Sequence, residues 1–293
     1  MSVQSYFILG RPLNSILAGS AVAIGALAAL SAPLTTTQLW YIILGCITTG
    51  FISAYGYAIN DIFDIEIDKI NVPHRPIPSG SVSLNGAKWF SVITLSLGLA
   101  FAVLIDFIAI LLALSGIILL YLYAAHFKRS GFPGNLIVAL LAAIPFVFGG
   151  FVTQSYTTLI YPASFAFLIN LGRELIKDIE DVDGDKLENV QSIALRYGVK
   201  PARNLAYIIL FALVIIIPFP ILLRYYTSVP FFIAVILIMG SILYTVPLSF
   251  NHSEDLIIHN TTSIKKILKI CMTIGVIGFM SEGIINLIKF TFN

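Results

Sequence analysis

Long apolar runs separated by short polar segments dominate the pattern of this chain. Nine stretches of about 20 mainly apolar residues recur along it, each about as long as an α-helix needs to cross a bilayer. The runs lack the alternation of polar and apolar positions that β-barrel strands show. The pattern therefore predicts an all-α polytopic membrane protein. The expected spans are residues 13–31, 38–60, 87–105, 107–125, 135–152, 158–177, 204–223, 228–249 and 266–288.

Composition agrees with this pattern. Hydrophobic residues make up 58% of the 293 residues, charged residues only 11%, and the mean hydropathy is +0.95. A soluble domain carries roughly 25% charged residues. The connections on one side of the predicted bundle are only short turns, so no separate soluble domain is expected. We predict one transmembrane domain over residues 1–293.

The basic residues lie mostly on one side of the membrane. With nine spans, 15 of the 17 lysines and arginines fall on the side of Arg11, and only Arg224 and Lys289 fall on the other. Cytoplasmic loops carry such an excess. The chain is therefore expected in the cell membrane with its N-terminus and its long polar loops in the cytoplasm. The small net charge of +2 is uninformative without this placement.

Two predicted spans end in acidic motifs of identical spacing on that cytoplasmic side. The aspartates are Asp61, Asp64 and Asp68 after the second span, and Asp178, Asp181 and Asp185 after the sixth. Offsets of 0, 3 and 7 place three carboxylates on one face of an α-helix. One such motif is an acidic helix end as readily as a site. Two copies on otherwise charge-poor helices favour a functional site.

A divalent cation would relieve the repulsion within each acidic motif. Mg²⁺ prefers carboxylate oxygens, keeps several waters, and is usually shared with substrate phosphates. Asn60 adds an amide oxygen beside the first motif. We expect the metal ligands among Asn60, Asp61, Asp64, Asp68, Asp178, Asp181 and Asp185.

Basic residues flank both motifs and predict a diphosphate site. They are Arg75, Lys128, Arg129, Arg173 and Lys177. Metal-bridged carboxylates with convergent arginine and lysine can hold a diphosphate, and arginine donates bidentate hydrogen bonds. Membrane topology alone accounts for basic residues on this side equally well. Arg75 and Lys177, next to the motifs, are the stronger candidates.

These motifs make the chain resemble the UbiA superfamily of intramembrane prenyltransferases over essentially its whole length. The resemblance is carried by "NDIFDIEID" (Asn60–Asp68), "RPIPSG" (Arg75–Gly80), "KDIEDVDGD" (Lys177–Asp185), a Tyr123-to-Lys128 element and "RPLN" (Arg11–Asn14). The tyrosine and the lysine have four residues between them here, where three are usual in the family.

The resemblance implies a nine-helix bundle around a central cavity that opens to lipid, with a cytoplasmic cap. It implies that magnesium, held by both motifs, binds the diphosphate of a polyprenyl donor. The implied catalytic residues are Asp64, Asp68, Asp181, Asp185, Lys177 and Tyr123, with Tyr121 as an alternative to Tyr123. The implied phosphate-binding residues are Asn14, Arg75, Lys128, Arg129, Arg173 and Lys177.

Within this family the chain is most similar to archaeal enzymes of ether-lipid synthesis. These enzymes transfer a geranylgeranyl group from geranylgeranyl diphosphate to 3-O-geranylgeranylglyceryl phosphate. Arg129, Arg173, Arg196 and Lys200 offer surplus positive charge for the acceptor's phosphate. Membrane lipid is the expected surrounding, and no nucleic-acid partner is expected.

Two other functions stay open from the sequence. Prenylation of an aromatic quinone precursor, such as hydroxybenzoate or homogentisate, uses similar motifs, and an arginine can bind a benzoate carboxylate. A cation transporter is a more remote alternative, because acids in membranes often mark ion paths. Transporters place their sites near the bilayer midplane, whereas both motifs here lie at the cytoplasmic edge.

Overall fold

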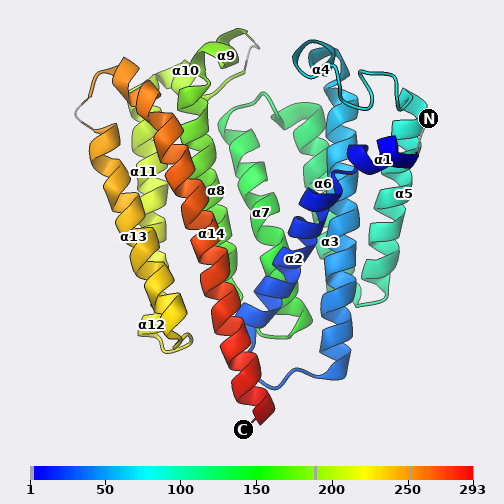
Figure 1. Cartoon of the computed structure of the whole chain (residues 1–293), viewed down its shortest axis with the longest axis vertical. Coiled ribbons are helices and arrows are strands. Elements are labelled where there is room, and N and C mark those ends of the chain that lie inside the picture. Colours follow the sequence, from blue (N-terminus) through cyan, green and yellow to red (C-terminus); the bar gives the residue numbers. More distant parts are fainter. Residues whose placement is uncertain (1–2, 188–189, 251, 293) are drawn as a thin grey trace.

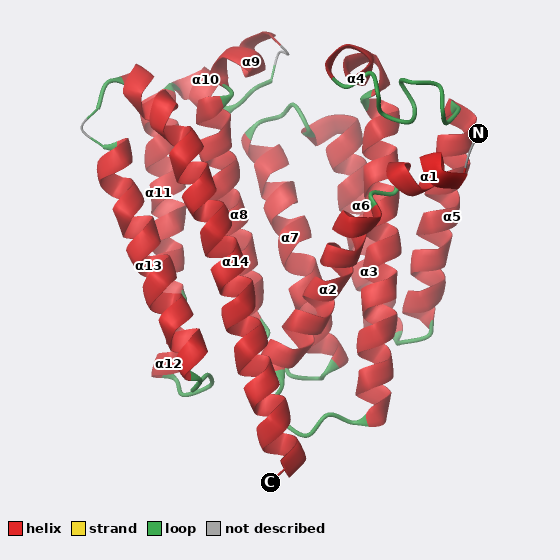
Figure 2. Cartoon of the chain, in the orientation of Figure 1, coloured by secondary structure: helices red, strands yellow, loops and turns green. Residues whose placement is uncertain are grey.

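The structure is a computed structural model that describes residues 3–187, 190–250 and 252–292, and the part described consists of helices and loops (Figure 2). The elements are α1 (Val3–Leu9), α2 (Pro12–Ala29), α3 (Thr36–Phe63), α4 (Ile65–Asn71), α5 (Leu84–Val103), α6 (Phe107–Leu122), the π-helix η1 (Tyr123–Phe127), α7 (Phe132–Val152), α8 (Ile160–Glu180), α9 (Val182–Leu187), α10 (Ile193–Tyr197), α11 (Val199–Ile216), α12 (Phe219–Leu222), α13 (Val229–Ser249) and α14 (Glu254–Phe292). The all-α prediction is confirmed.

The long helices coincide with the predicted spans. Among the described residues, 8 helices are apolar and long enough to cross a membrane. The remaining predicted span, residues 158–177, corresponds to α8, whose final turns carry Arg173, Glu174 and Lys177 and are too charged for α8 to be one of these 8. Figure 1 shows α1 and the end of α14 at opposite ends of the molecule, as an odd number of crossings requires. The exact count of nine spans stays a prediction.

Two boundaries differ from the sequence prediction, each for a physical reason. Pro218 lies between α11 and α12 and ends the longer helix, since proline lacks an amide donor and its ring clashes with the preceding turn. Helix α14 begins at Glu254, twelve residues before the predicted span, and is 39 residues long. At 1.5 Å per residue that is almost twice the thickness of the hydrocarbon core, so α14 also extends beyond the bilayer.

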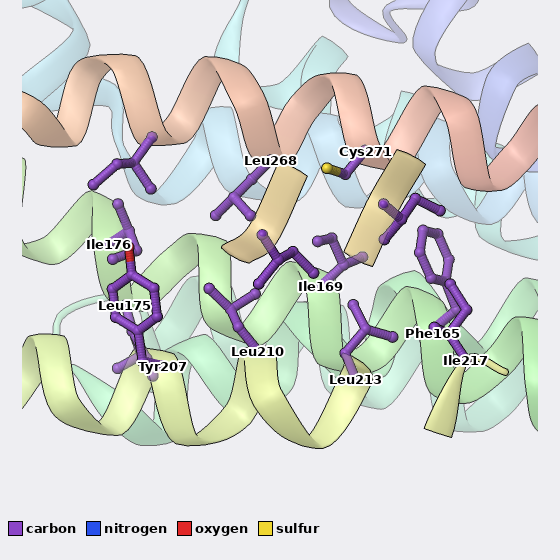
Figure 3. Close-up of a cluster of buried hydrophobic side chains, with 14 of the residues drawn as sticks. Phe165, Ile169, Leu175, Ile176, Tyr207, Leu210, Leu213, Ile217, Leu268 and Cys271 are labelled. Atoms are coloured by element: carbon purple, nitrogen blue, oxygen red, sulfur yellow. The ribbon is translucent and has the colours of Figure 1, made fainter. Parts of the chain in front are cut away.

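Hydrophobic packing divides the bundle into two groups of helices. One buried cluster joins α2, α3, α6 and α7, whereas a larger one joins α8, α11, α13 and α14. Figure 3 shows part of the larger cluster, with Leu175 and Ile176 of α8 near Tyr207 and Leu210 of α11. The two acidic motifs follow α3 and α8, so each group of helices supplies one of them.

Glycines allow α2 and α7 to pack closely against each other. A Cβ atom on Gly25 of α2 would lie 2.6 Å from the Cα of Phe146, and one on Gly149 of α7 would lie 2.2 Å from the carbonyl oxygen of Val22. In lipid no hydrophobic driving force brings helices together, so they associate through close packing of this kind. Small residues at these positions therefore permit the close approach of α2 and α7.

The polar connections gather at one end of the bundle. Figure 1 places α4, α9 and α10 there, at the ends of α3 and α8, with α1 beside the upper part of α3. The backbone N–H of Gln191, before α10, donates to the carbonyl of Arg129, before α7, at 2.9 Å. This hydrogen bond fixes the loop after the second motif against the loop between η1 and α7. Short helices and loops thus cover the end where both motifs lie.

Candidate functional site

Each acidic motif is interrupted at its middle aspartate. Asp64, between α3 and α4, has φ −90° and ψ 4°, and Asp181, between α8 and α9, has φ −89° and ψ 9°. Both amides still close a helical turn, donating at 3.0 Å to the carbonyls of Asn60 and Lys177. These dihedrals fall in the sparsely populated bridge region, where many active-site residues lie. The spacing suggested one continuous helix per motif; the structure has a long and a short helix, with matching geometry at both motifs.

Arg75 holds the outer aspartates of the first motif together. Its Nη1 lies 2.6 Å from Oδ2 of Asp68 and 3.4 Å from Oδ1 of Asp61. Both carboxylates are buried, whereas the arginine side chain is partly exposed. The prediction that this motif presents its acids to one side is thus confirmed for the folded chain, despite the interruption at Asp64.

Asp64 is held by two donors from different helices. Asn60, one turn earlier on α3, donates from Nδ2 to Oδ2 at 2.7 Å, and Lys128 after η1 forms an ion pair with the same oxygen. Asp64 itself is buried. A lysine 64 positions away in sequence therefore reaches the centre of the first motif, as expected for a candidate phosphate-binding residue.

Arg11 is a site residue that the sequence prediction treated only as a topology signal. Its Nη2 lies 2.6 Å from Oδ1 of Asp61, and its guanidinium lies 4.7 Å from the centre of the Tyr57 ring. Arg11 adopts the left-handed conformation, with φ 44° and ψ 64°, which is costly for a residue with a side chain and concentrates at functional sites. The "RPLN" element contains Arg11, but the sequence prediction selected Asn14 from that element as a phosphate-binding residue.

The π-helix η1 brings Tyr123 and Lys128 to the same side. The N–H of Lys128 bonds to the carbonyl of Tyr123 at 2.9 Å, five residues back. On a regular α-helix five residues turn by about 140°, so the two side chains would point apart. A π-turn absorbs one extra residue, and such turns often occur at functional sites. The unusual spacing of this element therefore has a structural explanation.

A cavity of about 310 Å³ lies between these residues. It is lined by Arg11, Ser53, Gly56, Tyr57, Asn60, Leu120, Tyr123, Lys128, Val138 and Leu141. A second cavity of about 140 Å³ shares Ser53, Leu120 and Leu141 with it and is otherwise mostly apolar. Ligand pockets of this kind pair an apolar lining with a few convergent polar groups. A polar head and an apolar tail fit this pair of cavities.

Tyr123 lies between the two motifs. Its phenol is within electrostatic range of Asp64 from the first motif and of Glu174 and Asp178 on α8. Asp178 is half-buried and accepts a hydrogen bond from Nδ2 of Asn135 at 2.7 Å. Asp181 is exposed, and the side chain of Asp185 lies outside what the structure describes. Acids of both motifs thus lie within electrostatic range of Tyr123, which lines this cavity.

Several predicted residues do not line this cavity. Asn14 and Arg129 are exposed and absent from its wall. Tyr121 is also largely exposed and packs edge-on against Phe63, so Tyr123 is the tyrosine at the site. Arg173 and Lys177 form a separate group with Glu174. Phosphate binding by Asn14 and Arg129 stays a prediction.

The donor set suits a hard divalent cation. Asn60 and the buried acids of the first motif supply only oxygen ligands, which Mg²⁺ prefers. Among the described side chains, no three carboxylate, imidazole or thiolate groups lie ready to chelate a metal, since those of the first motif pair with Arg11, Arg75 and Lys128. Ion pairs of this kind compensate the charge of the buried acids and hold them in place.

Comparisons with known proteins agree with this arrangement. The sequence profile of the UbiA prenyltransferase family matches residues 18–256. A digeranylgeranylglyceryl phosphate synthase from Saccharolobus solfataricus is 37% identical over 96% of this chain and 97% of its own length.

Two solved structures have the same fold. One, from a study of digeranylgeranylglyceryl phosphate synthase in membranes, is 32% identical, with a TM-score of 0.83 over 96% of this chain and 98% of that one. The other, a UbiA homologue from Archaeoglobus fulgidus bound to DMAPP and Mg²⁺, is 21% identical, with a TM-score of 0.69 over 94% and 99%. Family profile, full-length relatives and the two kinked aspartate motifs all lead to one conclusion: the chain is an integral membrane protein of the UbiA prenyltransferase family.

Proposed function

We propose that the protein transfers a geranylgeranyl group from geranylgeranyl diphosphate to the free hydroxyl of 3-O-geranylgeranylglyceryl phosphate, releasing diphosphate. One observation supports this most strongly: two acidic motifs with the same backbone geometry place acids within electrostatic range of Tyr123, which lines a cavity that also contains Arg11 and Lys128 and adjoins an apolar one. The choice of donor and acceptor rests on the relative from Saccharolobus solfataricus, which is named for that product.

The donor's diphosphate is proposed to lie between the motifs. Asn60, Asp64, Asp68, Asp181 and Asp185 would hold magnesium there, with Asp61 and Asp178 behind them, an assignment that rests on the motif resemblance. When bound, the metal neutralises charge on the diphosphate as it leaves.

This chain's own cations act on the same charge. Arg75 and Lys128 already contact the acids of the first motif, and both can turn to phosphate oxygens when magnesium takes their place. Donors aimed at charge that develops in the transition state are usually the largest contribution to catalysis. Lys177, one turn before Asp181 on α8, is proposed to approach the diphosphate from the second motif.

The wall of the cavity suits the reacting carbon. Breaking the bond between C1 and oxygen leaves positive charge on the allylic carbon, and the faces of Tyr57 and Tyr123 can stabilise a cation. The apolar cavity beyond Leu120 and Leu141 would take the isoprenoid tail. The diphosphate leaves with the electron pair of the bond between C1 and oxygen; the acceptor's hydroxyl oxygen then bonds to C1, and its proton is proposed to pass to an aspartate carboxylate of the motifs. Excluding water from this wall prevents hydrolysis of the cation.

The site is proposed to face the cytoplasm. Arg11, Arg75, Lys128, Arg173 and Lys177 all lie toward the end that holds α4, α9 and α10, whereas Arg224 follows α12 at the opposite end. An excess of basic residues marks cytoplasmic loops. The charged end of the bundle is therefore assigned to the cytoplasm.

An acceptor comparison tests the proposed function. Purified protein is given labelled geranylgeranyl diphosphate and magnesium with one acceptor at a time: 3-O-geranylgeranylglyceryl phosphate, hydroxybenzoate or homogentisate. Label is expected in a di-ether product only with the first. Transfer confined to an aromatic acceptor would replace the proposal with quinone-precursor prenylation.

A further inference from the structure

A second group of charged side chains lies on α8 and α14. It consists of Arg173, Glu174, Lys177, Glu180 and Lys265, of which only Lys265 belongs to α14. Lys265 was not among the residues expected from the sequence to bind a substrate. Its position is what makes this group a candidate binding site.

Lys265 points into the bundle, unlike its neighbours. Its side chain is 27% exposed and forms an ion pair with Glu180, and it lies within electrostatic range of Lys177 and Arg173. Lys266 and Lys269, on the same helix, are exposed. The positive-inside rule accounts for the charge of all three lysines, but it does not account for the inward contact of one of them.

Positive charge in this group exceeds negative charge. The group has three cations and two carboxylates. Both Arg173 and Lys177 form ion pairs with Glu174, with nitrogen–oxygen distances of 2.9 Å and 3.8 Å. The Nε of Arg173 is buried, with no hydrogen-bond partner among the described residues. Buried donors are nearly always paired. Its lack of a partner, together with the surplus charge, indicates a site for an anion.

The position of the group relates it to the acceptor rather than to the donor. Glu174 lies within electrostatic range of both Tyr123, which lines the reaction cavity, and Lys265, so Glu174 connects the group to the residue that faces the reacting carbon. Arg11, Arg75 and Lys128 already supply the cations around the first motif. The same helix α14 exposes Ile270 and Ile277, which offer an apolar surface for a lipid chain.

We propose that Lys265 and Arg173 bind the phosphate monoester of the lipid acceptor, with Lys177 between this phosphate and the donor's diphosphate. The inference rests on the proposed function, because it requires an acceptor with both a lipid chain and a phosphate. A planar guanidinium suits two phosphate oxygens at once, and an ammonium group completes the charge. Binding the phosphate opposite the first motif directs the acceptor's free hydroxyl toward C1 of the donor.

Initial rates separate acceptor binding from donor binding. With Lys265→Ala, KM for 3-O-geranylgeranylglyceryl phosphate is expected to rise about tenfold or more, the loss of roughly one charge-assisted hydrogen bond. KM for geranylgeranyl diphosphate and kcat are expected to change less than about twofold on the same scale. Lys266→Ala, on the adjacent exposed residue, is the matched control and is expected to behave as the wild type. A rise in the donor's KM, or an unchanged acceptor KM, would overturn the proposal.

The Glu180→Gln variant tests whether the ion pair between Glu180 and Lys265 has only a structural role. Loss of this charge removes the ion pair between α8 and α14 and frees Lys265, so the acceptor's KM is expected to fall. If Glu180→Gln raises KM as Lys265→Ala does, the lysine only braces the two helices and the proposal is wrong.

Measuring acceptor binding without the donor distinguishes failure of the phosphate site from failure of the proposed function. The Kd of 3-O-geranylgeranylglyceryl phosphate is expected to rise in Lys265→Ala, while the Kd of geranylgeranylglycerol, which lacks the phosphate, is expected to stay the same. Equal changes for both ligands would contradict a phosphate site. Absence of transfer by the wild type would refute the proposed function instead, whatever the variant binds.

Discussion

Replacing Arg75 with alanine removes the cation that joins Asp61 to Asp68. The contact to Asp68 at 2.6 Å is a short, charge-assisted hydrogen bond, and the one to Asp61 at 3.4 Å is weak. A hydrogen bond to a charged group contributes about 1.5–3 kcal/mol. The arginine side chain is 31% exposed, so water screens the pair and the lower end of that range applies. We therefore expect Arg75→Ala to cost about 2 kcal/mol of stability.

The effect of Arg75→Ala on catalysis is expected to be larger than its effect on stability. Removing one donor that stabilises charge in a transition state lowers kcat about 10²–10³-fold. Arg75→Lys keeps the charge but not the second donor, so its kcat should lie between those of the alanine variant and the wild type.

Lys69→Ala provides the matched control for Arg75→Ala. Lys69 pairs with Glu66 at 2.7 Å, but the two side chains are 52% and 77% exposed, and such surface pairs contribute only about 0–1 kcal/mol. The assay is label transfer at saturating substrates, with thermal unfolding in detergent to confirm folding. The reasoning fails if Arg75→Ala keeps nearly normal kcat, or if Lys69→Ala loses as much.

Three further changes test the cavity and the packing. Tyr123→Leu removes an aromatic face worth about 0.5–2 kcal/mol to a cation, so kcat should fall several-fold or more, while Tyr121→Leu, on the exposed tyrosine, should not change it. Gly116→Leu fills the cavity of about 140 Å³ without a backbone clash, since the nearest atom to its Cβ is Ile52 Cγ2 at 3.8 Å. The ratio of kcat/KM for geranylgeranyl over geranyl diphosphate should therefore fall, and an unchanged ratio would place the tail elsewhere. Gly149→Leu puts a Cβ 2.2 Å from the carbonyl of Val22 and should lower the unfolding temperature in detergent, whereas Gly240→Leu, whose Cβ meets nothing within 4 Å, should not.

The sequence predicted the long helices and the positions of the two motifs, because the lengths of apolar runs and the spacing of aspartates are local properties of the chain. Apolar runs of membrane length identified the long helices, and two identical aspartate spacings placed both motifs at one end of the bundle. The spacing did not predict the interruptions at Asp64 and Asp181, since a continuous helix and a kinked one can present the same side chains. Backbone conformation at a single residue leaves no periodic signal.

Residues brought in from distant helices were harder to predict. Arg11 and Lys265 both looked like charges placed by membrane topology, and only their inward contacts with Asp61 and Glu180 distinguish them. The π-turn between Tyr123 and Lys128 is visible in the sequence only as one extra residue. In each case the three-dimensional contact, rather than the residue type, carries the information.

The central claim is that both aspartate motifs belong to one transferase site, and label transfer by two variants tests it most directly. Asp64→Asn and Asp181→Asn change one motif each and keep side-chain size. With labelled geranylgeranyl diphosphate, 3-O-geranylgeranylglyceryl phosphate and magnesium, each single variant is expected to lose nearly all transfer while remaining folded.

Asp106→Asn is the control for these two variants. Asp106 caps α6, where its Oδ1 accepts the N–H of Ala109 at 2.7 Å, and asparagine caps helices about as well as aspartate, so transfer should continue. Nearly normal transfer by either Asp64→Asn or Asp181→Asn would contradict a site shared by the two motifs.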